Sequence, residues 1–334
     1  MKVLLTGANG LLGHNILLKL LENGHEVNAI VRKKESLSVI NPKLYITEGS
    51  FININDLSKA AKGCDAVIHV AATTDMSLLR YSDFEEVIVK GSQSVLDVCR
   101  EQNIKTIVYI STANTIGYGT AEKLADETCP MQPPFTESFY AQAKTEAEKL
   151  FLERAKETDN HVIIINPGFM LGAFDSKPSS GAMLLAAHHK WLAVATSGGK
   201  NFVHVGDVAQ SAVNALAAGV SGERYIVGGT NLTIKELYRL QREVSGWPKH
   251  VLVLPDGLVK IVGLFGDLLR KCRLTVPFSS VNLRQLCVRE YYSSQKAIED
   301  LKMPQTPISE AIGDSLDWFA GTGKMRITKK LSCK

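Results

Sequence analysis

What this sequence has little of narrows the classes of protein it can encode. Its six cysteines are spread along the chain, with no C-x-x-C pair among them. That spacing argues against a zinc site or a disulfide framework and favours reduced thiols, as in a cytoplasmic protein. The most apolar late stretch, residues 258–269, is interrupted by Lys260 and Asp267. A stretch of that length cannot cross a bilayer, so we expect no membrane span and interpret it as an amphipathic lid or substrate-pocket helix.

Strong charge of either sign is missing as well. The net charge is +4 over 334 residues, and only the C-terminal end concentrates basic residues, at positions 324, 326, 329, 330 and 334. We interpret that end as a solvated terminus rather than a contact for nucleic acid or membrane. A hydrophobic content of 45% and a charged content of 22% are ordinary for a globular protein of one or two closely joined domains. The first apolar run begins at once, so we expect no signal peptide before it.

A glycine-rich turn follows that first apolar run. Residues 3–5 are Val-Leu-Leu, Thr6 ends the run, and Gly7, Gly10 and Gly13 precede a helical pattern. Gly7 permits a tight turn, Gly10 lets the backbone approach a phosphate, and Gly13 lets a helix pack closely on the strand. The free N–H groups at the start of that helix would then face an anion. The turn predicts a site for the pyrophosphate of a nucleotide cofactor, with a ligand-free glycine turn as the alternative.

Strand-like runs alternate with helical patterns through the first half of the chain. The strand-like runs are 3–7, 27–32, 43–48, 66–71, 106–111 and 161–166, and the helical patterns are 11–22, 56–62, 84–101 and 138–157. This alternation predicts an α/β fold with a doubly wound parallel sheet. Helical patterns then dominate, at 182–190, 207–218, 233–245, 256–271, 293–301 and 308–320. The strand-like run 224–229 is expected to return to the main sheet.

A tyrosine and a lysine four residues apart are the candidate catalytic pair. Tyr140 and Lys144 share one face of the predicted helix 138–157. A phenol that gives or takes a proton at neutral pH needs a lowered pKa, and a nearby ammonium lowers it. Tyr292 and Lys296 have the same spacing, but no element of the nucleotide site lies beside them. We therefore assign the proton transfer to Tyr140 and interpret the later pair as a structural helix start.

A hydroxyl at the end of the run 106–111 is the third catalytic candidate. It would lie above the carboxyl edge of the sheet, where it can bond a substrate carbonyl oxygen. Ser111 and Thr112 are both available, and a hydroxyl that only caps the next turn is the alternative.

The end of the second strand bears on the choice of nucleotide. An NAD site usually carries Asp or Glu there, to accept hydrogen bonds from the ribose hydroxyls. Here Val31 is followed by Arg32, Lys33 and Lys34, so no carboxylate would repel a 2′-phosphate and a guanidinium could bind one. The alternative is an exposed basic turn.

Several motifs together resemble one superfamily. They are D-A-V-I-H-V-A-A at 65–72, V-Y-I-S-T-A-N-T-I-G at 108–117, I-N-P-G-F-M-L-G at 165–172, F-V-H-V-G-D-V at 202–208 and Trp318-Phe319. With the glycine turn, they are similar to the extended short-chain dehydrogenase/reductases, also described as the NAD-dependent epimerase/dehydratase family. The resemblance covers about residues 1–320 and is nearest to dihydroflavonol-4-reductase-like proteins.

The resemblance implies specific roles and boundaries. It places the catalytic hydroxyl on Thr112 rather than Ser111. It implies that the cofactor contacts Gly7, Asn9, Gly10, Leu11, Leu12, Gly13, Arg32, Ser50, Phe51, Val70, Ala71, Ala72, Tyr140, Lys144, Pro167, Gly168 and Phe169. Ser50 stands where relatives often carry Asp, which leaves that contact open. Residues 1–170, completed by about 202–229, would form an NADP-binding Rossmann domain; 171–201 and 230–334 would form a smaller, mostly helical substrate domain and the tail.

We therefore predict an NADP(H)-dependent oxidoreductase that interconverts a carbonyl and an alcohol on a small molecule. Tyr140 would be the acid/base, Lys144 the group that lowers its pKa, and Thr112 the group that positions the carbonyl. The main alternative is a nucleotide-sugar epimerase or dehydratase with tightly bound NAD, and the second is a non-catalytic nucleotide-sensing protein. His69 is expected to pack inside a strand rather than to catalyse. We expect no bound metal and no nucleic-acid partner, and a homodimer is left open.

Overall fold

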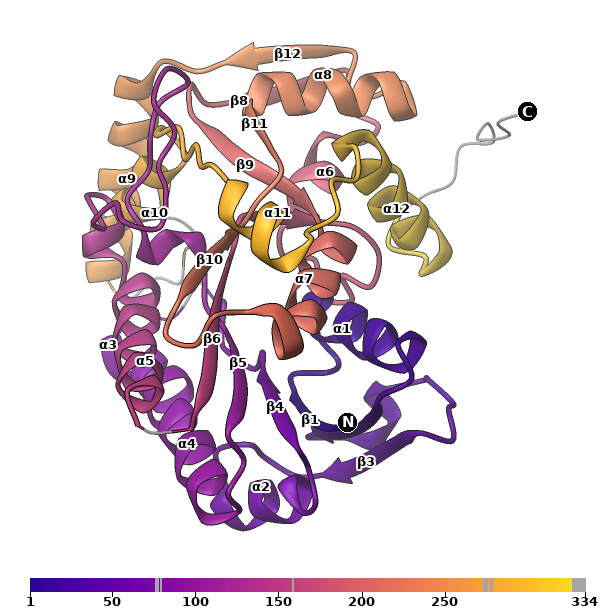
Figure 1. Cartoon of the computed structure of the whole chain (residues 1–334). Helices are drawn as coiled ribbons and strands as arrows, with labels where there is room; N and C mark the ends of the chain where they lie inside the picture. Colours follow the sequence, from indigo (N-terminus) through magenta and orange to yellow (C-terminus); the bar gives the residue numbers. More distant parts are fainter. Residues whose placement is uncertain (76–77, 79, 158, 273–275, 277–278, 326–334) are drawn as a thin grey trace.

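The structure is a computed structural model, shown in Figure 1, and it describes residues 1–75, 78, 80–157, 159–272, 276 and 279–325. Of the basic C-terminal cluster only Lys324 lies within these residues, so the interpretation of that end falls outside the described part of the chain.

The fold is built on a seven-stranded parallel sheet, as the sequence predicts. Its strands, in spatial order, are β10 (Arg224–Val227), β6 (His161–Pro167), β5 (Thr106–Ile110), β4 (Ala66–His69), β1 (Lys2–Thr6), β2 (Glu26–Val31) and β3 (Leu44–Glu48). The order reverses after β1, because β2 and β3 lie on one side of it and β4 on the other. In open parallel sheets, ligands bind at the carboxyl ends of the strands near such a reversal.

Each face of the sheet carries its own apolar core. Val3 and Leu5 of β1 belong to one core and Leu4 to the other, because successive strand side chains point to opposite faces. One face is covered by α1 (Leu11–Glu22), α7 (Val205–Ala218) and α11 (Gln295–Leu301), and the other by α2 (Ile54–Ala61), α4 (Gly91–Glu101) and α5 (Phe139–Ala155). Burial on both faces explains why these strands read as continuous apolar runs.

The rest of the chain forms a smaller unit at the carboxyl edge of the sheet (Figure 1). Its helices are α6 (Ala182–Ala187), α8 (Ile234–Ser245), α9 (Asp256–Lys271), α10 (Ser280–Gln285) and α12 (Ile308–Gly321). Its strands are β7 (Phe169–Leu171), β9 (Gly199–His204) and β11 (Thr230–Thr233) in one small sheet, and β8 (Leu192–Ala195) and β12 (His250–Val253) in another. Helices dominate this unit, as the sequence predicts, and the short strands that accompany them pair only with segments distant in sequence.

Several boundaries also differ from the sequence prediction. The single helix expected over 84–101 begins three residues earlier, as α3 (Tyr81–Phe84), a π-helical turn (Glu85–Lys90) and α4. Three short 3-10 turns complete the elements: Lys34–Ser36, Ala113–Thr115 and Phe135–Glu137. Among the described residues, no helix combines the length and the apolar character that a membrane crossing requires.

Candidate functional site

The predicted site residues come together at the carboxyl edge of the central sheet. Because all seven strands are parallel, the loops that follow β1, β4, β5 and β6 emerge side by side. These loops carry Gly7, residues 70–72, Thr112 and residues 167–169. The start of α5 lies at the same edge, because Lys144 on α5 contacts the last residue of β5.

The glycine turn has the shape that a phosphate site needs. Gly7 adopts a φ of +74°, and the Gly10 N–H donates to the Gly7 carbonyl at 3.0 Å. A Cβ on Gly13 would lie 2.0 Å from the Gly7 oxygen, so only glycine lets α1 approach this closely. Gly10 caps α1 without a side chain, and the first turn of α1 holds no acidic residue. The N–H groups at that helix start therefore suit an anion, and the residues fit a dinucleotide.

The segment after β4 is fixed against the glycine turn. The Thr6 hydroxyl accepts hydrogen bonds from the Val70 and Ala71 N–H groups, each at 3.1 Å. It also bonds the Nδ1 atom of His69 at 2.7 Å. Burial, with a smaller contribution from the Lys144 charge, lowers the pKa of His69 to about 3. His69 is therefore a neutral, buried residue that packs inside the fold, as predicted.

The loop after β2 lies beside the glycine turn. Arg32 follows the last residue of β2 and is exposed. The Asn9 amide donates to the Ser36 hydroxyl at 3.2 Å, which joins the glycine turn to this basic loop. Ser36 is a further polar group here that the sequence prediction missed. The Glu48 carboxylate, at the end of β3, accepts from the Lys34 N–H at 3.2 Å, so one carboxylate does lie near the loop.

Ser50 and Phe51 follow β3, where the adenine half of a dinucleotide would lie. Phe51 packs against Gly91, where a Cβ would lie 2.6 Å from the ring, and 5.6 Å from the ring of His69. Phe51 thus offers an aromatic surface at this edge. The Ser50 N–H donates to Asp56 at 3.0 Å, and its hydroxyl accepts weakly from the Ile52 N–H at 3.4 Å. Ser50 therefore organises its own loop.

Thr112 lies beside Tyr140 at the carboxyl edge of the sheet. The Thr112 hydroxyl accepts a hydrogen bond from the Asn114 N–H at 3.3 Å, so it caps the turn that follows β5, and its proximity to the phenol favours a lower pKa of Tyr140. Burial has the larger effect and raises the pKa of Tyr140 to about 12. The Ser111 hydroxyl is buried with no hydrogen-bond partner among the described residues. Thr112, rather than Ser111, is therefore the hydroxyl that influences the Tyr140 phenol.

Lys144 does not lower the pKa of Tyr140 in the way that the sequence predicts. Its Nζ atom donates to the Ile110 carbonyl at 2.7 Å and lies 4.8 Å from the centre of the Tyr109 ring. Burial lowers the pKa of Lys144 to about 7, and the Glu148 charge opposes part of that shift. The expected lowering is absent because desolvation of the phenol outweighs any effect of a half-titrated amine at neutral pH.

A buried network behind Lys144 was not found from the sequence. Glu148 is one turn further along α5 and only 3% exposed. Its Oε1 atom accepts from the Thr115 hydroxyl at 2.7 Å and from the Asn166 amide at 2.6 Å. Asn166 also donates to the Thr112 carbonyl at 3.1 Å. The network therefore ties Lys144's helix to the ends of β5 and β6. The spacing of Glu148 four residues after Lys144 was its one visible signal.

The segment 167–169 continues β6 at the same edge. The Gly168 N–H donates to the Val227 carbonyl at 3.0 Å, and a Cβ on Gly168 would lie 2.7 Å from Asn201. The Phe169 ring meets the Phe202 ring edge-on, with centroids 5.4 Å apart. The segment therefore joins the central sheet to the smaller unit.

The second tyrosine–lysine pair is structural. The Tyr292 side chain is 2% exposed and donates to the Ala113 carbonyl at 3.3 Å. Lys296 forms an ion pair with Glu223 at 2.6 Å and donates to the Arg224 carbonyl. Neither group is free to act on a substrate, as the sequence analysis expects.

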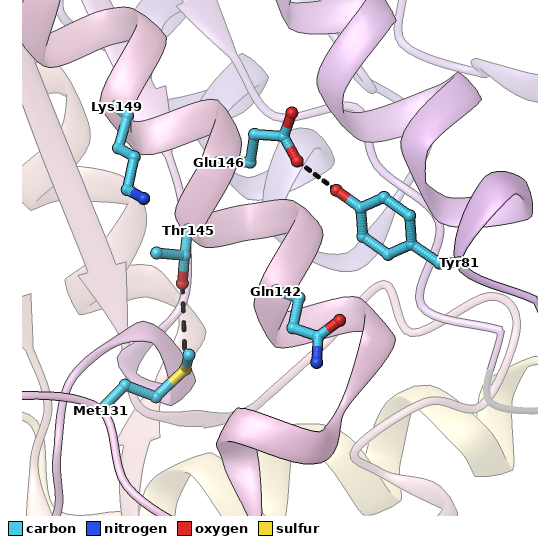
Figure 2. A pocket seen from close by; sticks show the side chains of 6 residues that line it. All are labelled: Tyr81, Met131, Gln142, Thr145, Glu146 and Lys149. Atoms are coloured by element: carbon cyan, nitrogen blue, oxygen red, sulfur yellow. Dashed lines mark hydrogen bonds between the residues drawn. The ribbon is translucent and has the colours of Figure 1, made fainter.

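Figure 2 shows a hollow on the outer side of α5. Gln142, Thr145, Glu146 and Lys149 line it from α5, with Tyr81 on one side of the helix and Met131 on the other. Tyr81 donates a hydrogen bond to Glu146 across it. Tyr140, Lys144 and Glu148 are absent from this lining, so the hollow is separate from the site at the sheet edge.

Comparisons with known proteins identify the family and the fold. A family model for the NAD dependent epimerase/dehydratase family matches residues 3–228. The chain is similar to a putative dihydroflavonol 4-reductase of Synechocystis sp., at 26% identity over 96% of this chain and 95% of the relative. It is also similar to sterol demethylase protein B of Methylococcus capsulatus, at 26% identity over 97% and 99%. The solved structure of gox2253 superposes with a TM-score of 0.82 at 27% identity, covering 98% of this chain and 99% of that one.

Proposed function

The chain belongs to the NAD dependent epimerase/dehydratase family, and we propose that it is an NADP(H)-dependent oxidoreductase that interconverts a carbonyl and an alcohol on a small molecule. The observation that carries this proposal is that Thr112 lies close enough to Tyr140 to affect the pKa of its phenol, at the edge of the sheet where the glycine turn lies. Two groups that can bond one carbonyl oxygen therefore stand beside a site suited to a dinucleotide.

Tyr140 is the candidate proton donor for a reduction. The phenol carries its proton at neutral pH, and burial raises its pKa to about 12, so a nearby positive charge is needed to ease the transfer. Thr112 would bond and orient the carbonyl oxygen that receives this proton. Lys144, while charged, would stabilise the phenolate left behind. The bound cofactor supplies the hydride, and the protein supplies orientation and the proton.

The loop after β2 supports NADP(H) over NAD(H). Arg32 is exposed there, and Ser36 lies in reach of the glycine turn through Asn9. A guanidinium and a hydroxyl are both suitable donors to a 2′-phosphate. Glu48 pairs with Val31, the last residue of β2, but belongs to β3, and its carboxylate accepts the Lys34 N–H; no carboxylate belongs to the end of β2 itself, where an NAD site would place one.

Net hydride transfer tests the reaction class. The full-length protein is incubated with NADPH deuterated at C4 and with a panel of ketones and aldehydes. We expect one product alcohol that carries deuterium at the carbinol carbon, with one NADP⁺ formed per alcohol. A substrate that is isomerised with no net NADP⁺ would instead support the epimerase alternative.

The two neighbouring hydroxyls give a test of the strand register. Thr112→Ala should lower kcat/KM more than Ser111→Ala, because Thr112 lies beside Tyr140 and the Ser111 hydroxyl is buried without a partner among the described residues. Steady-state kinetics of both variants, with their melting temperatures, measures this. The reverse order would show that Ser111 positions the carbonyl.

Glu148 should control the pH range of activity. Its charge raises the pKa of Lys144 against the effect of burial. In Glu148→Gln the negative charge is removed, so the pKa of Lys144 should fall below its value of about 7. The Lys144 ammonium should then lose its proton at a lower pH than in the wild type. The decline of kcat/KM toward alkaline pH should therefore begin at a lower pH than in the wild type. A lowered melting temperature with an unmoved pH profile would mean that Glu148 is only structural.

Three further features are part of the proposal. The division into a cofactor domain and a substrate domain near residue 170 stays a prediction. So does a cytoplasmic location, which the free thiols of Cys64, Cys99, Cys129, Cys272 and Cys287 support. The homodimer also stays open, and sedimentation velocity would decide it.

A further inference from the structure

Helix α9 exposes its apolar side to solvent, whereas a surface helix of a globular protein usually buries that side. Over residues 256–270 its exposed side chains are apolar with one exception, Lys260. The large ones are Leu258 (48% exposed), Ile261 (64%), Val262 (42%), Leu264 (64%), Phe265 (56%) and Leu268 (55%). Their spacing places them on a single stripe along the helix. A contiguous apolar face of this kind marks an interaction site in a soluble fold.

Gly263, Gly266 and the two aspartates of α9 face the protein instead. A Cβ on Gly263 would lie 2.8 Å from the Ser280 backbone, so α9 packs closely on α10 along its glycine side. Asp267 accepts a hydrogen bond from the Ser280 N–H at 3.1 Å. Asp256 accepts one from the Ser197 hydroxyl. Both carboxylates of α9 thus accept hydrogen bonds from other parts of the protein.

A second exposed apolar face precedes α9. β8 and β12 pair so that Val194 lies opposite Leu252 and Leu192 opposite His250. Leu192, Val194 and Leu252 are between 41% and 52% exposed, and Trp191 is 68% exposed with its ring 4.6 Å from that of His250. Only residues 254–255 separate β12 from α9, and Figure 1 shows β12 running into the corner where α9 begins. We call the exposed residues of β8, β12 and α9, with Trp191, the α9–β12 surface.

The charges at this surface have one sign. The exposed charged side chains of residues 190–195 and 249–270 are Lys190, Lys249 and Lys260, and His250 lies with them. Among these described residues no carboxylate is exposed, because Asp256 and Asp267 are partnered inward. The surface therefore combines apolar side chains, a tryptophan and a positive rim.

We propose that the α9–β12 surface binds the face of an anionic lipid bilayer, with α9 lying in the plane of the interface. An apolar helix face buries itself at the acyl boundary, lysines meet anionic headgroups, and tryptophan favours the interface. A second copy of the chain fits less well, because a symmetric contact would bring two positive rims into one interface with no exposed carboxylate from these segments to pair with them. The inference does not depend on the reaction that the site performs.

Vesicle flotation of the full-length protein tests the proposal. We expect the protein to float with vesicles of phosphatidylcholine mixed with phosphatidylglycerol, and less with phosphatidylcholine alone or in high salt. Ile261→Asp with Phe265→Asp should lower the partition coefficient by roughly tenfold or more, because two apolar side chains no longer enter the lipid. The matched control is Ile40→Asp with Val220→Asp, which replaces two other exposed apolar residues (99% and 54% exposed) and should float as the wild type does.

Lys260→Glu tests the electrostatic part separately. It should weaken flotation with the anionic vesicles and reduce the salt dependence, with the melting temperature unchanged because Lys260 is exposed. The proposal is overturned if the wild type floats with neither composition, or if flotation survives Ile261→Asp with Phe265→Asp. A dimer in sedimentation velocity that this same pair of substitutions abolishes, with no vesicle binding, would assign the surface to a second copy.

Discussion

Tyr140→Phe should lower kcat/KM by about 10²–10⁴, the usual worth of a positioned proton donor. The phenol lies beside Thr112 at the carboxyl edge of the sheet, and with a pKa of about 12 it carries its proton at neutral pH. Phenylalanine keeps the ring, which packs edge-on near Phe84 at 6.4 Å, so the fold and cofactor affinity should be unchanged. Steady-state kinetics with a nucleotide titration measures both effects.

Tyr292→Phe is the matched control for that experiment. Tyr292 has the same spacing to a lysine, yet its hydroxyl bonds the Ala113 carbonyl inside the fold. Its loss should leave kcat/KM within a fewfold of wild type, with a small loss of stability of about 1 kcal/mol. Near-normal turnover of Tyr140→Phe, or a larger loss in Tyr292→Phe, would contradict the assignment of the acid.

Arg32→Ala should weaken NADPH binding by about one to two orders of magnitude and leave NADH binding nearly unchanged. A hydrogen bond between the guanidinium and a 2′-phosphate is worth roughly 1.5–3 kcal/mol, and 1.4 kcal/mol corresponds to tenfold in affinity. Val31→Asp should shift the preference further toward NADH, because a carboxylate there bonds the ribose hydroxyls and repels the phosphate. Fluorescence titration of both nucleotides measures these affinities.

Lys59→Ala controls for the loss of one positive charge. Lys59 is exposed near the end of α2, outside the loop that carries Arg32, so both nucleotides should bind as they do to wild type. Equal affinity of the wild type for NADH and NADPH would remove the reason to prefer a reductase over an epimerase.

The central sheet was predictable because its strands are buried on both faces. Runs such as residues 107–110 are continuously hydrophobic, and the glycines at 7, 10 and 13 mark the turn that follows β1. β8 and β12 were missed for the opposite reason. They are short, half-exposed and paired with each other across more than fifty residues, so neither run carries a strong signal of its own.

The site was only partly predictable, because the spacing of residues along one helix does not show which distant groups their side chains contact. The spacing of Tyr140 and Lys144 places them on one helix face, but it does not show where the lysine points. The structure directs its amine to the Ile110 carbonyl and buries it, which sets its pKa near 7. The Glu148 network joins residues from α5, β6 and the turn after β5. Contacts between segments so far apart in the sequence leave no local sequence pattern from which they could be predicted.

The nucleotide that copurifies with the protein tests the central claim most directly. The purified protein is denatured, and the released nucleotide is identified by mass before and after exchange against excess NADPH. An NADP(H)-dependent reductase should release NADP(H) or nothing, and should take up added NADPH readily. Stoichiometric NAD that resists exchange would contradict the account and would identify the chain as an epimerase or dehydratase of the same family.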